Sequence, residues 1–230
     1  MEKVLTGKRI TIFAGHYGSG KTNIAVNYAL ALRKKYPNKD VALADLDIVN
    51  PYFRTKDSAD IMRQNGIRLI SSEFANSNVD LPALPPDTYA IFDNKEIFGV
   101  IDVGGDDRGA LAMGRYTPRI IEDGSYDFIF VINKFRPLTK NVSDTVAVMA
   151  EIEQAAGMKF TGIANNSNLG DITTAKDVLS SAPYAEEIAK KTGLEIKMTT
   201  VKKSLEAELR DKIKGLAPMT LYVKQSWEEM

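Results

Sequence analysis

Short apolar runs alternate with amphipathic segments along most of the chain. The apolar runs have the length of buried β-strands and occupy residues 8–15, 40–47, 67–70, 97–105, 126–133, 159–166 and 194–200. Between them, apolar residues at helical spacing predict helices over residues 22–36, 58–66, 108–124 (broken near Pro118), 138–157, 174–193 and 202–215. This alternation is typical of parallel βαβ units, so we predict an α/β fold of three layers, with a mostly parallel central sheet between two layers of helices.

The chain shows no internal repeat and no low-complexity linker, and residues 1–230 are predicted to form a single domain. The segment 71–86 is polar and contains prolines, so we expect it to be irregular. Parallel sheets bind ligands beyond the carboxyl ends of their strands. Gly15 and Gly104–Gly105 follow two predicted strands, and we therefore expect a site at that edge.

The composition excludes several classes of site. The chain has no cysteine and one histidine, which excludes disulfides, thiolate metal sites, a cysteine nucleophile and a histidine-rich zinc site. Lys and Arg number 30, as do Asp and Glu, so the formal net charge of +0 does not argue for broad binding to nucleic acid or acidic membranes. No apolar run approaches the about 18 residues needed to span a bilayer, and the first residues are too polar for a secretory signal. We expect a cytoplasmic protein.

Residues 15–22 read GHYGSGKT and match the phosphate-loop (P-loop) pattern G-x-x-x-x-G-K-[ST], with a predicted strand before and a helix after. Its glycines let backbone N–H groups converge on one anion, and the helix N-terminus adds its positive dipole. Lys21 would bind the β- and γ-phosphates and stabilise charge during hydrolysis, and the Thr22 hydroxyl would bind Mg²⁺. The candidate nucleotide-binding residues of this segment are Gly15, His16, Tyr17, Gly18, Ser19, Gly20, Lys21, Thr22 and Asn23. The alternatives are a glycine-rich turn without a ligand and an idle His16 side chain.

Carboxylates follow two other predicted strands. Asp47 lies just past one strand end, where it could bind Mg²⁺ and orient the attacking water, whereas the earlier Asp45 is expected to be structural. Asp102 near another strand end would be a Mg²⁺ ligand that faces the P-loop, and Gly104 or Gly105 could turn an N–H toward the γ-phosphate. Each segment alone could be an ordinary turn, but beside a P-loop we interpret both as functional.

Together the P-loop, the segment 45–47, DVGG at 102–105 and GIANN at 162–166 resemble the MinD/ParA class of P-loop ATPases. This SIMIBI-type branch also contains the nitrogenase iron protein and CooC-type nickel-insertion ATPases. The resemblance covers nearly the whole chain. It implies a P-loop nucleoside triphosphatase fold, a three-layer α/β/α sandwich, with ATP and Mg²⁺ as ligands.

The resemblance also implies roles for single residues. Asp47 matches the switch I aspartate that supports hydrolysis, and Asp102 and Gly105 match switch II. Asn165 or its neighbour Asn166 matches the asparagine that contacts adenine. Proteins of this class commonly bind ATP between two subunits, so the resemblance implies a nucleotide-dependent homodimer.

The chain departs from the class pattern in its charged and cysteine positions. The class usually carries a lysine after the first P-loop glycine, but His16 stands here, so Arg54 or Arg108 would have to supply the cation, or the dimer does not form in that way. The absence of cysteine excludes a cluster-carrying or nickel-carrying role by the class route. Asn133-Lys134 begins like the guanine motif N-K-x-D, but its fourth position is Arg136, which favours ATP over GTP.

These features predict an ATP-hydrolysing switch, slow without a partner, that acts on another protein. The main alternative is a ligase or kinase of the same fold, with a substrate pocket from residues 71–89. A positioning protein on DNA or membrane is disfavoured by the zero net charge and the short C-terminus, which ends in acidic residues. A nucleotide-binding protein without useful hydrolysis is disfavoured by the two carboxylate segments.

Overall fold

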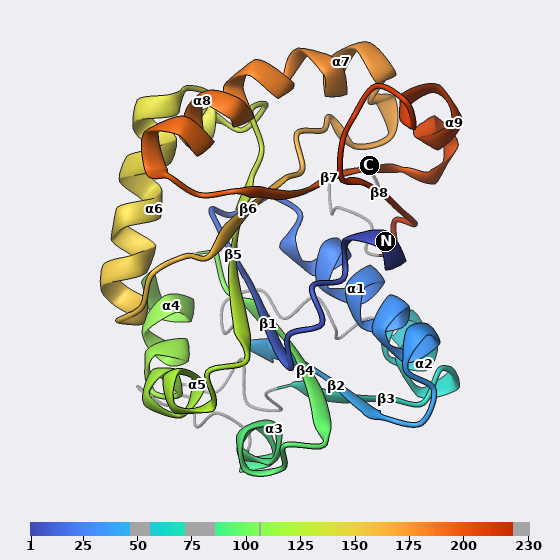
Figure 1. Cartoon of the computed structure of the whole chain (residues 1–230), viewed down its shortest axis with the longest axis vertical. Helices are drawn as coiled ribbons and strands as arrows, with labels where there is room; N and C mark the ends of the chain where they lie inside the picture. The colour runs from blue at the N-terminus through green and yellow to red at the C-terminus, as the bar shows by residue number, and fades with distance from the viewer. Residues whose placement is uncertain (47–55, 72–85, 106, 223–230) are drawn as a thin grey trace.

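A parallel β-sheet forms the centre of the molecule (Figure 1). A computed structural model of the chain describes residues 1–46, 56–71, 86–105 and 107–222. Within these ranges, eight strands pair in parallel in the order β3-β2-β4-β1-β5-β6-β7-β8. They are β1 (Ile10–Ala14), β2 (Asp40–Leu46), β3 (Ile67–Ser71), β4 (Ile97–Val103), β5 (Tyr126–Ile132), β6 (Gly162–Asn165), β7 (Ile196–Lys202) and β8 (Leu216–Met219). The predicted α/β fold with a parallel central sheet is confirmed.

Helices cover both faces of the sheet, with α1 and α2 on one side and α4, α5 and α6 on the other (Figure 1). The helices are α1 (Lys21–Lys35), α2 (Lys56–Gln64), α3 (Tyr89–Asp93), α4 (Asp107–Gly114), α5 (Thr117–Asp123), α6 (Val142–Ala156), α7 (Ala175–Ser180), α8 (Ala182–Thr192) and α9 (Glu206–Leu209). Strand residues alternate between two cores: Phe13 belongs to the core on the α1 side, and Ile12 to the core on the α6 side. Burial of both faces explains why the strands read as continuous apolar runs. None of the helices in the described part of the chain is long and apolar enough to cross a membrane.

Two regions differ from the predicted elements. The helix break expected near Pro118 falls at Arg115–Tyr116, and Pro118 lies in the first turn of α5, where its missing N–H costs nothing. The helix predicted over 202–215 is confirmed only in its first half: the chain forms a 3₁₀ turn at Lys203–Leu205 and the single turn α9, and residues 210–215 form turns instead. The apolar residues of this segment pack against α7 and β7. The expected irregular segment 71–86 lies almost wholly outside the described residues.

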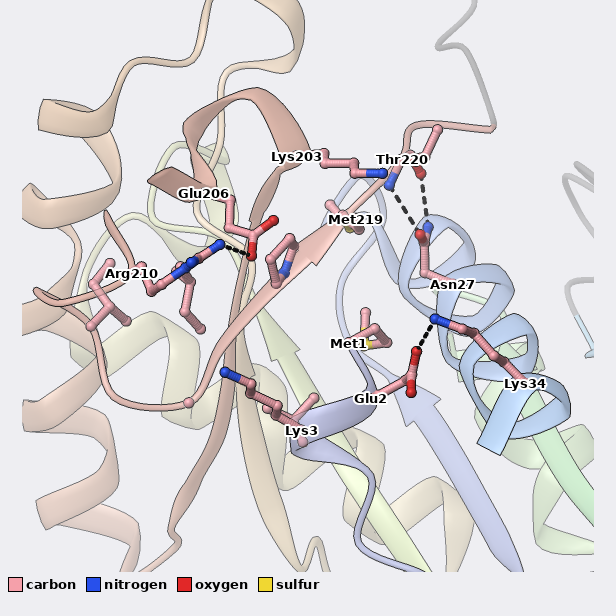
Figure 2. Close-up of a pocket in the computed structure, with 15 residues that line it drawn as sticks. Met1, Glu2, Lys3, Asn27, Lys34, Lys203, Glu206, Arg210, Met219 and Thr220 are labelled. Atoms are coloured by element: carbon pink, nitrogen blue, oxygen red, sulfur yellow. Dashed lines mark hydrogen bonds and ion pairs between the residues drawn. The ribbon is translucent and has the colours of Figure 1, made fainter. Parts of the chain in front are cut away.

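The sequence patterns also miss strand β8, which pairs with β7 beside the N-terminal segment. Its four residues include Pro218, which lacks a backbone donor and is tolerated only at a sheet edge. A cavity of about 770 Å³ lies between β8, α1 and the first residues of the chain, and Figure 2 shows its lining. On its wall, Asn27 of α1 exchanges two hydrogen bonds with the backbone of Thr220, at 2.8 and 3.0 Å. These bonds fasten the helix that follows the P-loop to the segment that follows β8.

Candidate functional site

The carboxyl ends of β1, β2 and β4 bring the predicted site segments together. β1 lies between β4 and β5, so the P-loop that follows β1 leaves the sheet beside the end of β4. In the register of the sheet, Asp102 of β4 lies next to Phe13 of β1 and next to Asp45 of β2. Both aspartates are buried. Parallel pairing thus places two carboxylates at the foot of the P-loop.

Thr22 and Asp102 meet directly. The Thr22 hydroxyl donates a hydrogen bond of 2.6 Å to Asp102 Oδ2. Thr22 lies in the first turn of α1, and Asp102 is buried near the end of β4. A hydroxyl and a carboxylate are oxygen ligands of the kind that Mg²⁺ prefers. This donor pair fits a magnesium ion at the edge of the P-loop.

The P-loop is compact and closes on itself. Ser19 N donates to His16 O at 3.1 Å, and Lys21 Nζ reaches the same carbonyl at 3.4 Å. The Ser19 hydroxyl is buried and has no hydrogen-bond partner among the described residues. The Lys21 ammonium and a curled backbone fit an anion, and so does the Ser19 hydroxyl, because burial of that hydroxyl without a partner is costly. The His16 ring has a hydrogen bond to the neighbouring backbone, between Nδ1 and Tyr17 O at 3.0 Å.

Two glycines are required by close approach to the loop. Gly20 has φ of +87°, and a Cβ there would overlap the Asn166 amide nitrogen. Gly105 lies against the P-loop backbone, since a Cβ on it would stand 2.6 Å from Tyr17 N and 2.7 Å from Tyr17 Cα. The segment after β4 therefore touches the P-loop without a side chain between them. Because these two backbones are in contact, a movement of one toward the other would require the other to move as well.

The two candidate asparagines face different neighbours. Asn166 Nδ2 donates to Ser19 O of the P-loop at 2.6 Å, and Asn166 Oδ1 accepts from the Thr200 hydroxyl at 2.6 Å. Asn165 instead donates to the Ser181 hydroxyl at 2.9 Å, away from the loop. Of the two, only Asn166 has a hydrogen bond to the P-loop in the part of the chain that the structure describes, and the contact of either residue with adenine stays a prediction.

The Asn23 side chain, another candidate, has a partner in the C-terminal segment. Asn23 Oδ1 accepts a hydrogen bond from Tyr222 N at 2.9 Å. Together with Asn27, it ties the first turns of α1 to the chain after β8. This side chain therefore secures the helix that carries Lys21 and Thr22.

Arg136 is the residue that sequence reasoning missed. It follows β5, and its Nε donates to Gly18 O of the P-loop at 2.8 Å. In the sequence, Arg136 was considered only as the fourth position of a segment that resembles the guanine motif N-K-x-D. Its position just after β5 could have pointed to it, because β5 pairs with β1 and residues that follow the two strands lie close together.

Several predicted residues lie outside the described structure. Asp47 and Arg54 are not among the described residues, and neither is the side chain of Arg108. The water-orienting role of Asp47 and the two cation candidates therefore stay predictions. Gly15 and Gly18 lie between β1 and α1, and Gly104 lies against Gly109 at the start of α4; their contacts with a nucleotide stay predictions.

Comparisons with known proteins support the fold. No family model matches the sequence, and no curated protein matches it either. Similar solved structures include chloroplast FtsY from Physcomitrella patens (14% identity, TM-score 0.57, covering 86% of this chain and 61% of that one). Others are the 54 kDa signal recognition particle protein from Aeropyrum pernix in complex with GDP (16%, 0.52, 86% and 43%) and FtsY from Mycoplasma mycoides (16%, 0.51, 84% and 59%).

The chain thus spans less than two thirds of the length of these neighbours. Identities this low show a shared fold, which is that of the P-loop nucleoside triphosphatases. They do not establish the MinD/ParA class, which stays a prediction.

Proposed function

We propose that the protein is a nucleotide-driven switch that binds and hydrolyses ATP with Mg²⁺ and acts on a protein partner. The observation that carries the proposal is the hydrogen bond between Thr22 and Asp102 at the foot of a complete P-loop. In P-loop proteins a loop hydroxyl and a strand-end carboxylate hold the magnesium ion, directly or through water. When bound, Mg²⁺ neutralises negative charge on the phosphates.

The chain's own residues would divide the work as follows. Lys21 binds the β- and γ-phosphates, and the loop N–H groups hold the phosphate oxygens. Asp47 orients the attacking water. Gly105, whose backbone lies against Tyr17, senses the γ-phosphate and passes its loss to α4. A site without a completing cation would turn over slowly.

ATP is proposed as the nucleotide, although two structural neighbours were solved with GDP. At the fourth position of the N-K-x-D-like segment, Arg136 replaces the acid that would accept guanine's N–H groups, and it turns toward Gly18. The Asn133 amide is engaged with the Asn168 backbone at 3.2 and 3.3 Å. Competition of unlabelled ATP and GTP against a fluorescent ATP analogue tests this choice, and tighter GTP binding would contradict it.

The loops that follow the strands expose apolar side chains at the same edge. We call Tyr17, Leu138, Leu169 and Ile172 the apolar rim; each is at least 41% exposed. They follow β1, β5 and β6, three successive strands of the sheet, so they lie in and beside the P-loop at the carboxyl edge. Such a rim supports a protein partner there, and we propose a second copy of this chain.

Association is tested by light scattering with ATP·Mg²⁺ and with ADP, using Asp47→Ala to retain ATP. We expect a dimer with ATP and a monomer with ADP. Ile172→Ser should weaken the dimer, whereas Ile121→Ser, at an exposed position of α5, should not. A monomer under both conditions would contradict the homodimer.

Hydrolysis is tested by phosphate release from ATP with Mg²⁺ or with EDTA. We expect slow Mg²⁺-dependent release that Lys21→Ala and Asp47→Ala abolish. Release that depends on an added small carboxylate or alcohol would favour the ligase or kinase alternative. Release that Asp47→Ala leaves unchanged would contradict the role given to Asp47.

A further inference from the structure

Buried hydrogen bonds hold the turn that carries Arg136. Its first residue, Asn133, accepts hydrogen bonds through its carbonyl from Arg136 N at 3.1 Å and from the Thr139 hydroxyl at 2.8 Å. The Thr139 carbonyl in turn accepts from the Tyr184 hydroxyl at 2.6 Å and from the Thr145 hydroxyl at 3.2 Å. Asn133, Thr139, Thr145 and Tyr184 are all buried. A buried network thus fixes the turn after β5 to α6 and α8.

From this turn, Arg136 holds one peptide group of the P-loop from outside. Arg136 Nε donates to Gly18 O, and the N–H of the same peptide, on Ser19, donates to His16 O. The C=O and N–H of a trans peptide point in opposite directions, so the peptide is held at both ends. Its orientation is therefore set before any nucleotide arrives.

The next peptide is held in a similar way. Asn166 donates to Ser19 O, which turns the N–H of Gly20 to the opposite side. Arg136 and Asn166 come from the ends of two neighbouring strands, β5 and β6. The carbonyls of Gly18 and Ser19 thus each accept a hydrogen bond from a side chain outside the loop, and the side chain on Gly18 is the cationic one.

We propose that Arg136 is a positioning residue of the P-loop, which orders the loop for phosphate binding through the Gly18 carbonyl. The proposal rests on the proposed nucleotide-binding function and adds a residue that holds the loop in its binding conformation before the nucleotide arrives. An ordered loop loses less conformational entropy when the phosphates bind, so Arg136 acts on affinity. Because ATP and ADP use the same loop, both affinities should depend on it equally.

The test measures the Kd of ATP·Mg²⁺ and of ADP·Mg²⁺ by fluorescence titration. Arg136→Ala should weaken both nucleotides by about tenfold, equivalent to about 1.4 kcal/mol. Arg136→Lys, which keeps a donor and the charge, should restore most of the affinity. Lys140→Ala removes one positive charge from an exposed position at the end of the same turn and is expected to bind as the wild type does. The urea midpoint of each variant shows whether it is folded.

The outcomes separate this proposal from the function on which it rests. Wild-type protein that binds neither nucleotide overturns the proposed function and this inference together. If the wild type binds both nucleotides and Arg136→Ala binds them with the same Kd values as the wild type, the inference alone is overturned. A lowered urea midpoint with unchanged Kd in both Arg136→Ala and Arg136→Gln assigns Arg136 a stability role only and also overturns the inference. Loss for ATP but not for ADP also overturns it, because a positioning residue acts on both.

Discussion

The structure predicts that Gly20→Ala lowers the free energy of unfolding and also prevents nucleotide binding. Gly20 has φ of +87°, a left-handed conformation that costs a residue with a Cβ about 1–2 kcal/mol. The new Cβ would also overlap Asn166 Nδ2 and break the hydrogen bond of 2.6 Å to Ser19 O. Leaving that carbonyl without a partner costs about 1–3 kcal/mol. We therefore expect the free energy of unfolding to fall by about 2–5 kcal/mol and nucleotide binding to be lost.

Gly157→Ala provides the matched control. Gly157 follows α6 with φ of +66°, and nothing lies within 4 Å of a Cβ there. It carries the backbone cost alone, so we expect a loss of about 1–2 kcal/mol and unchanged nucleotide affinity. Urea denaturation and fluorescence titration measure the two quantities. In an Asn166→Ala background, Gly20→Ala should cost less than in the wild type, because the atom it strikes is gone. Equal stability and equal nucleotide affinity for the two glycine variants would refute the reasoning.

Two further predictions concern the site and the turn after β5. Thr22→Val removes the hydroxyl that donates to Asp102 and should abolish the gain in ATP affinity on adding Mg²⁺, whereas Thr22→Ser should keep that gain. Titrations of ATP with and without EDTA measure the gain. A Mg²⁺ effect that is retained in Thr22→Val would contradict the role given to the Thr22 hydroxyl. Burial raises the pKa of Tyr184 to about 12 from about 10 when unfolded, so its contribution is complete below pH 10 and is lost as pH rises toward 12. Across this range the wild type should lose about 2–3 kcal/mol more unfolding free energy than Tyr184→Phe, and equal losses would contradict the buried environment.

The fold was predictable because most strands are buried on both faces. Their continuous apolar runs, with helices between them, specify parallel pairing. Strand β8 could not be found in this way, because Pro218 argues against a strand and only the edge position makes it acceptable. The helix predicted over 202–215 was too long for a different reason. Leu205 and Leu209 lie in the short helical stretch and pack against α7 and β7, but Ile213 packs there too from the turns that follow it, so the apolar spacing continues beyond the helix.

The site divides along a similar line. The P-loop and Asp102 are encoded locally, since their function depends on residues next to one another in the sequence and on a strand end. Arg136 is not, because its contact with Gly18 exists only once β5 and β1 are neighbours. The choice between Asn165 and Asn166 has the same cause. Consecutive residues at a strand end point to opposite sides, so the sequence can name the pair but not the member that faces the loop.

The most direct test of the central claim is calorimetric titration of ATP·Mg²⁺ into the wild type and into Lys21→Ala. The account predicts one site per chain and binding that Lys21→Ala weakens by about tenfold to a hundredfold, as expected for loss of a charge-assisted contact. Absence of binding by the folded wild type, or equal binding by both proteins, would contradict the claim that this loop is a nucleotide site.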